Sequence, residues 1–178
     1  MDTQTMISDT GAIIYDLIQE VKSIPPEQIN VVPFDGSWTA GQLAEHLVLS
    51  CGGFVELMNG PVEDTQRQPD QMVAKLKEVF LDYNLKMKSP DFIDPPVKNY
   101  DKEELINVLM EIKQKLDHSM QTLELSKTCT AFELPQMGYV TRIEAMAFVL
   151  YHTSRHLHQL KKIHDELAKT SELKMADK

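Results

Sequence analysis

Apolar residues recur at helical spacing along most of the chain, whereas the alternation typical of β-strands is almost absent. The first periodic segment runs from about Thr5 to Ser23, and the paired prolines of IPPEQIN end it because proline cannot continue a helix. The second segment extends from Thr39 to about Met58. Thr39 followed three residues later by Gln42 has the form of a capping box, which predicts the start of this helix.

Three further helices are expected in the rest of the chain. A short, more polar one spans residues 71–83 and precedes the proline-rich loop SPDFIDPPVKNY. A long one begins at Asp101, which can cap it, and ends near residue 125, and the last spans residues 141–169. Four long amphipathic helices with one extended connection predict an all-α fold, a four-helix bundle with a crossover connection. We expect a single domain over residues 1–170 and a frayed tail over residues 171–178.

Composition and charge exclude several classes of function. The chain has 178 residues, enough for one domain with a real core, and a net charge of -9 from 27 acidic and 18 basic residues. This acidic balance argues against nucleic acid or an anionic membrane surface as a partner. No apolar run has the length of a membrane span, and the polar N-terminal stretch does not resemble a secretory signal. We therefore expect a small-molecule partner, and the apolar helix faces are also compatible with a homodimer.

The chain has two cysteines, Cys51 and Cys129, which are too few for a disulfide framework. This usage indicates a reducing, cytoplasmic setting. Cys51 is expected in the core, because it falls on the apolar face of its helix, and Cys129 is expected near the surface. Neither cysteine has a histidine partner in a motif, so we do not predict a cysteine nucleophile.

The stretch YHTSRHLHQL, residues 151–160, places three histidines on the last helix. At about 100° of rotation per residue, His152 and His156 lie one turn apart on the apolar face, whereas His158 points to solvent. Two imidazoles at this spacing can share a metal ion, but each can instead hydrogen-bond to a neighbouring group in the core. The spacing alone favours hydrogen bonding unless a third ligand lies on another helix.

His46 is the best candidate for that third ligand, since it borders the apolar face of its helix next to small residues that leave room for a cavity. His118 lies off the apolar face of its helix, and His164 lies at the edge of its own. A single histidine at the border of the core is the alternative interpretation of His46.

Two stretches carry a family resemblance. GSWTAGQLAEHLVLS resembles the first signature of the DinB-like superfamily, in which Trp-Ser or Trp-Thr opens a helix with a histidine eight positions after the tryptophan. YHTSRHLHQLKKI resembles the second, His-Thr-x-Arg-His-x-x-Gln. The resemblance implies a four-helix bundle over essentially the whole chain, a divalent metal held by His46, His152 and His156, and no DNA binding. Gln42 departs from the family, which often has Glu there, but no ligand is affected.

Three neutral imidazoles with open coordination positions are typical of catalytic metal sites. Zinc and nickel are the expected metals, and iron and manganese are alternatives. Gln159 projects near the same helix face and is a candidate for orienting a ligand or contacting substrate, and Arg155, at its edge, is a candidate for meeting an anionic group. For both residues a structural role at a helix–helix border is the favoured alternative.

Three functions are compatible with such a site. The first is metal-dependent transfer of a low-molecular-weight thiol to an electrophile, which needs no protein base and agrees with the outward direction of Glu45 and Glu56. The second is metal-dependent hydrolysis, which needs a general base or acid. The loop residues Asp35, Asp94 and Asp101 are candidates, but no motif contains them. The third is a non-catalytic small-ligand-binding or assembly module. The sequence therefore identifies no catalytic residue beyond the metal ligands.

Overall fold

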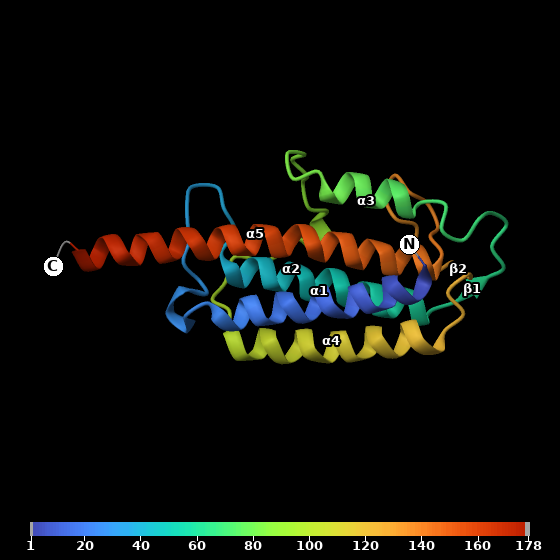
Figure 1. Ribbon diagram of the computed structural model, residues 1–178, viewed down its shortest axis with the longest axis horizontal. Coiled ribbons are helices and arrows are strands. Elements are labelled where there is room, and N and C mark those ends of the chain that lie inside the picture. The colour runs from blue at the N-terminus through green and yellow to red at the C-terminus, as the bar shows by residue number, and fades with distance from the viewer. Residues whose placement is uncertain (1, 177–178) are drawn as a thin grey trace.

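The computed structural model describes the backbone of residues 2–176 and the side chains as far as Thr170. Four long helices form an elongated bundle (Figure 1). They are α1 (Thr3–Ser23), α2 (Ala40–Asn59), α4 (Lys102–Thr122) and α5 (Arg142–Ala176). The remaining elements are short: α3 (Val73–Leu81), the 3₁₀-helices η1 (Pro26–Gln28) and η2 (Asp91–Ile93), and the antiparallel strand pair β1 (Val62–Glu63) and β2 (Thr128–Cys129).

In the bundle, α1 lies diagonally opposite α2, and α4 lies diagonally opposite α5. α1 packs against α4 and α5, and α2 packs against the same two helices. α1 and α5 run in one direction and α2 and α4 in the other (Figure 1). The connection between α2 and α4 therefore returns along the bundle, and it carries α3, which packs on α5. The all-α bundle with a crossover is thus confirmed.

Side-chain caps define the helix starts. Thr39 Oγ1 accepts from the Gln42 amide at 3.1 Å, and the Thr39 amide donates to Gln42 Oε1 at 3.0 Å, so the predicted capping box is present. Asp101 caps α4 as expected. Thr141 and Glu144 form the same reciprocal pair at the start of α5. Each cap satisfies amide groups that the first helical turn leaves without an intrahelical partner.

Several helix boundaries differ from the sequence-based expectation. α3 is shorter, from Val73 to Leu81, because residues 70–72 form a turn. α4 ends at Thr122 rather than near Leu125. α5 continues to Ala176 and so includes most of the segment expected to fray, while residues 177–178 lie outside the described residues.

The core lies between the inward faces of the four long helices. Among its fully buried members are Ile14, Leu17, Leu43, Leu47, Leu109, Leu116, Met146 and Leu160. Cys51 is buried as expected, but the placement of Cys129 near the surface is wrong, since Cys129 is 0% exposed. Its amide donates to the Val140 carbonyl and its strand pairs with β1, which together draw this segment inward.

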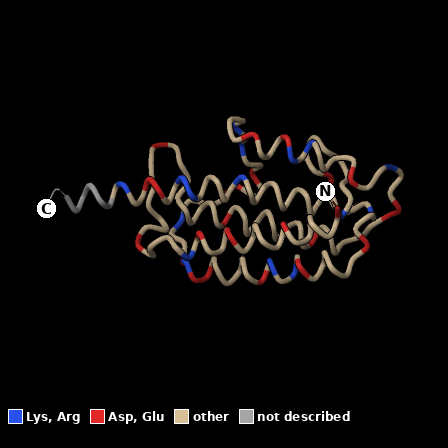
Figure 2. Tube along the Cα trace, viewed as in Figure 1, with Lys and Arg blue, Asp and Glu red and all other residues tan. Residues whose placement is uncertain are grey.

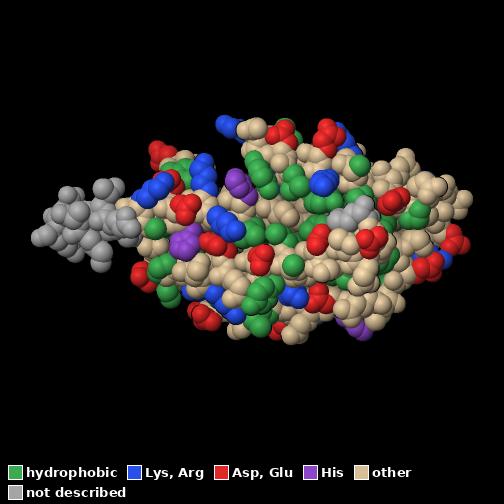
Figure 3. All heavy atoms as spheres, viewed as in Figure 1, with side chains coloured by type: hydrophobic (Ala, Val, Ile, Leu, Met, Phe, Trp, Pro, Cys, Tyr) green, Lys and Arg blue, Asp and Glu red, His purple; other side chains and the backbone are tan. Residues whose placement is uncertain are grey.

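Charged residues of both signs are spread along the helices and the loops (Figure 2). On the face drawn in Figure 3 they are interspersed with apolar side chains rather than gathered by sign. Within the described part of the chain, every helix is too short or too polar to cross a lipid bilayer.

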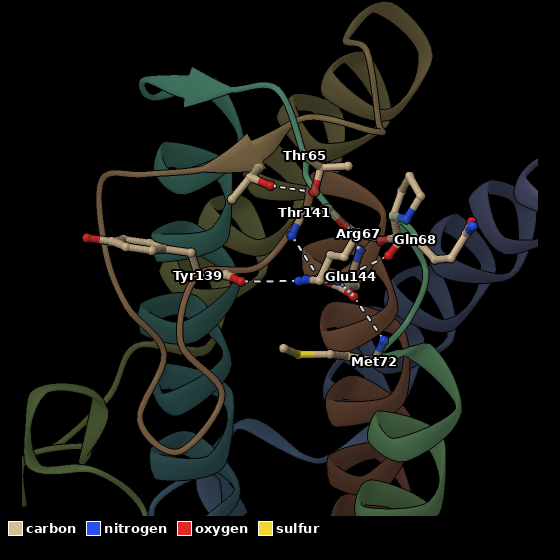
Figure 4. Close-up of polar contacts among 9 residues, drawn as sticks. Thr65, Arg67, Gln68, Met72, Tyr139, Thr141 and Glu144 are labelled. Carbon is tan, nitrogen blue, oxygen red and sulfur yellow. Dashed lines mark hydrogen bonds and ion pairs between the residues drawn. The ribbon is translucent and has the colours of Figure 1, made fainter.

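The crossover is bound to the N-terminal end of α5 by hydrogen bonds and an ion pair. Arg67 lies in the crossover and forms an ion pair with Glu144, in the first turn of α5 (Figure 4). The Met72 amide, just before α3, donates to the same carboxylate at 2.9 Å. These contacts fix where the crossover leaves the end of the bundle and turns back over α5.

Candidate metal centre

Three histidines meet inside the bundle. His46 comes from α2, and His152 and His156 come from successive turns of α5; their exposed fractions are 2%, 6% and 8%. Nε2 of His152 lies 3.2 Å from Nε2 of His46 and 3.0 Å from Nε2 of His156. Among the described residues these three form a group whose ligand atoms lie within 4.8 Å of one another. The structure therefore brings together the three residues that the sequence selected.

The outer nitrogens of two of these rings face oxygen acceptors. His46 Nδ1 lies 2.9 Å from the carbonyl oxygen of Ile93 in η2, and His156 Nδ1 lies 3.0 Å from Oε1 of Gln159. Because a carbonyl oxygen can only accept, each of these rings carries its proton on Nδ1 and directs the lone pair of Nε2 inward. Acceptors of this kind orient metal-ligating histidines in proteins generally.

The central ring, His152, shows that the donor set fits a cation. Its Nδ1 lies 3.4 Å from the hydroxyl of Ser50, and its Nε2 faces the lone pairs of both His46 and His156. A neutral imidazole has one proton to donate, so it cannot satisfy both neighbours. A divalent metal accepts all three lone pairs at once, and three imidazole nitrogens are a common ligand set for such a metal. The three histidines thus form a site for a divalent metal.

Burial keeps the imidazoles in the neutral form that binds metal. Desolvation lowers the pKa of His156 to about 3 and places the pKa of His152 well below its usual value, with the neighbouring rings adding to the effect on His152. Desolvation also lowers the pKa of His46, although the Ile93 carbonyl and the charge of Asp94 oppose this shift. Protons therefore do not compete for the ligand nitrogens at neutral pH.

Aromatic side chains surround the histidines. The ring of Trp38 lies 5.1 Å from that of His46, and the rings of Phe80 and Phe148 lie 5.4 and 5.2 Å from that of His152. These apolar groups restrict water near the site, which strengthens the interaction between an ion and its ligands.

The carboxylates named in the sequence analysis lie away from the three histidines or at the edge of the metal site. Glu45 pairs with Lys98 at 3.5 Å, and Glu56 is exposed. Asp94 follows Ile93, and its charge acts on His46. Sequence reasoning missed the polar partners Ile93 and Ser50, because a backbone carbonyl leaves no side-chain signal and no motif marks Ser50.

The structure gives the other two candidate site residues different surroundings. Gln159 contacts His156 directly. The guanidinium of Arg155 donates instead to the carbonyls of Phe80, at 3.3 Å, Asp82, at 2.8 Å, and Leu85. Arg155 thus holds the C-terminal end of α3 against α5, as in the structural alternative that the sequence left open.

The remaining histidines lie apart from the metal site. His158 is exposed and stacks on Tyr83 with 4.2 Å between ring centroids. His164 Nδ1 lies 2.7 Å from a carboxylate oxygen of Glu20 on α1, and His118 is exposed. The directions inferred for His158 and His118 from helix geometry agree with these positions.

Comparison with known proteins agrees with the bundle fold described above. The sequence profile of the DinB superfamily matches residues 13–160. YfiT from Bacillus subtilis, described as a probable metal-dependent hydrolase with an unusual four-helix bundle topology, is similar with a TM-score of 0.60 and 16% identity, over 93% of this chain and 87% of that one. A proposed DinB family member from Exiguobacterium sibiricum has a TM-score of 0.55 and 15% identity, over 94% and 93%. At these identities the two structures show a shared fold. No curated protein sequence matches the chain.

Proposed function

Because the chain belongs to the DinB superfamily and contains a three-histidine site for a divalent metal, we propose that it is a metal-dependent transferase that moves a low-molecular-weight thiol onto an electrophilic small molecule. The observation that carries this proposal is the electrical neutrality of the groups that lie within hydrogen-bonding distance of the outer imidazole nitrogens. Ile93 contributes a carbonyl, Gln159 an amide and Ser50 a hydroxyl.

Neutral ligands with neutral hydrogen-bond partners favour thiol activation in particular. A divalent metal that keeps its full charge among neutral ligands lowers the pKa of a bound thiol and makes it nucleophilic without a protein base. Ile93 and Gln159 hold His46 and His156 in the required tautomer, and Trp38, Phe80 and Phe148 limit the access of water. The ion pair of Glu45 with Lys98 agrees with a reaction that uses no carboxylate from α2.

Metal-dependent hydrolysis is the second candidate, and Asp94 is the observation that favours it. This exposed carboxylate follows Ile93, and its charge acts on the imidazole of His46. It is therefore the best-placed group described here to accept a proton in a hydrolytic reaction. The description of the structurally similar YfiT as a probable metal-dependent hydrolase points in the same direction.

The first test is elemental analysis of the wild type beside His46→Ala, with His118→Ala as a matched control on an exposed helix surface. We expect about one divalent ion per chain in the wild type and in His118→Ala, and none in His46→Ala. Equal metal contents in all three proteins would contradict the metal site.

Loaded protein is then assayed for the two reactions. Thiol transfer predicts that a thiol and an electrophile are consumed together, that His156→Ala abolishes this, and that Asp94→Asn does not change it. Turnover of ester, amide or lactone substrates without thiol, lost in Asp94→Asn, would support hydrolysis instead. If the loaded wild type exceeds His156→Ala in neither assay, the non-catalytic alternative replaces both proposals.

A further inference from the structure

The crossover contains a segment whose half-buried residues contact the metal site. In residues 84–94, here called the closing segment, every residue is exposed except Ser89 and Ile93. These two half-buried residues are the ones that contact His46. The Ile93 carbonyl lies 2.9 Å from His46 Nδ1, and the Ser89 hydroxyl lies 3.5 Å from the same nitrogen. Both half-buried residues of the closing segment therefore contact the same metal ligand, His46.

Both ends of the closing segment are attached to the bundle. On the N-terminal side, Arg155 binds carbonyls at the end of α3, and Tyr83 stacks on His158 at an interplanar angle of 10°. On the C-terminal side, Lys98 pairs with Glu45 of α2 at 3.5 Å, and the hydroxyl of Tyr100 donates to the carbonyl of Pro96 at 2.5 Å. A segment held at its ends and supported in the middle by one ligand can open locally without disturbing the four long helices.

A third contact joins the closing segment to a different loop. Phe92, in η2, meets Phe132 edge to face, with 5.8 Å between the ring centroids. Both rings are largely exposed, at 61% and 45%, so this contact adds little burial to the fold. Phe92 and Phe132 thus form a latch that can be removed without touching His46.

We propose that the closing segment is a lid whose closure is coupled to metal binding through the Ile93 carbonyl and His46. This carbonyl selects the form of His46 with its proton on Nδ1, and only that form offers Nε2 to a metal. In return, a metal on Nε2 fixes the proton on Nδ1 and so strengthens the hydrogen bond that holds the lid closed. Lid closure and metal binding favour each other by the same factor, because coupling between two sites is reciprocal. The inference rests on the metal site of the proposed function, but not on the reaction.

Amide hydrogen exchange with and without zinc tests the coupling. The amides of Ile93 and Asp94 donate to the carbonyls of Pro90 and Asp91 within η2, and they report opening of the lid. The Val31 amide, bonded to Gln28 beside the other 3₁₀-helix, is the matched control. Zinc is expected to slow exchange at Ile93 and Asp94 by about tenfold, a typical coupling, and to have much less effect at Val31. In His46→Ala, zinc is expected to have no effect on the lid amides.

Zinc release into an excess of chelator gives a second measurement. Phe92→Ala and Phe132→Ala each remove the latch and are expected to release zinc about fivefold faster than the wild type. Val97→Ala, at a crossover residue that is 93% exposed, is expected to release zinc at the wild-type rate. Circular dichroism of each variant verifies that the bundle is intact.

The possible outcomes distinguish failure of the lid proposal from failure of the proposed reaction. Equal effects of zinc at Ile93 and Val31, or equal release rates for Phe92→Ala, Phe132→Ala and Val97→Ala, would overturn the lid even if the protein is active. Slower lid exchange with zinc but no turnover would support the lid and contradict the proposed reaction. A chain that takes up no zinc, nickel or manganese would overturn both.

Discussion

Arg67 and Glu144 form a bidentate ion pair across 77 residues of sequence, with nitrogen–oxygen distances of 2.5 and 2.6 Å. The side chain of Glu144 is completely buried, and it also accepts from the backbone amides of Met72 and Thr141 (Figure 4). The pKa of Arg67 is raised, chiefly by its hydrogen bond to Glu144. One carboxylate therefore caps α5, pairs with a cation and anchors the crossover that covers the metal site.

Glu144→Gln is expected to lower the free energy of unfolding by about 3–5 kcal/mol, because it leaves a partly buried guanidinium without its counter-charge and turns an amide group toward backbone donors. Urea denaturation measures the change. Glu166→Gln, in an exposed ion pair with Lys169, is the control and is expected to cost about 0–1 kcal/mol. Similar losses in the two variants would show that the buried pair contributes no more than a surface pair.

Gln159→Leu is expected to weaken metal binding by about 10–100-fold, since His156 then lacks the acceptor that orients its ring. Gln159→Glu retains an oxygen acceptor and is expected to bind metal at least as tightly as the wild type. Competition with a chelator of known affinity measures both. Exposed Gln114→Leu serves as the control, and an affinity equal to it in Gln159→Leu would mean that Gln159 does not orient His156.

Arg155→Met is expected to destabilise the protein by about 1–3 kcal/mol, because carbonyls at the end of α3 lose a charged donor. Urea denaturation again gives the value, with exposed Lys161→Met as the control on the same helix. Unchanged stability together with a weaker apparent affinity for an anionic substrate would instead support the substrate-contacting role considered from the sequence.

Both cysteines are expected to resist alkylation in the folded protein at pH 8, because the thiolate is the reactive form. Burial raises the pKa of the Cys51 thiol to about 11 and raises the pKa of Cys129. Mass spectrometry after iodoacetamide treatment is expected to show no label without urea and two labels with it. Rapid labelling of either native cysteine would contradict this assignment.

The same pKa shift makes a prediction at alkaline pH. The thiol of Cys51 has its ordinary pKa of 9.0 in the unfolded chain, whereas its pKa in the folded chain is about 11. The unfolded state therefore binds fewer protons in this window, and the contribution of Cys51 to stability is complete below pH 9 and decreases as the pH rises toward 11. A Cys51→Ala variant is expected to lose stability less steeply than the wild type over this interval.

The features that sequence patterns predict correctly are local in the chain. The capping box of Thr39 and Gln42 and the one-turn spacing of His152 and His156 depend only on helical geometry, so the pattern predicted them directly. The apolar faces of four helices with one long connection sufficed for the fold class. The position of His46 at the border of the apolar face of α2 likewise follows from helix geometry.

The contacts between distant elements depend on how the helices pack. The diagonal placement of α1 and α2 depends on which helix faces pack together, and several packings satisfy the same apolar pattern. The Ile93 carbonyl behind His46 is a main-chain group, and every residue has one, so no residue type marks it. The pairing of Arg67 with Glu144 likewise follows from the path of the crossover. Sequence patterns specify which face a residue occupies, whereas its partner on another element is set by the packing of the whole bundle.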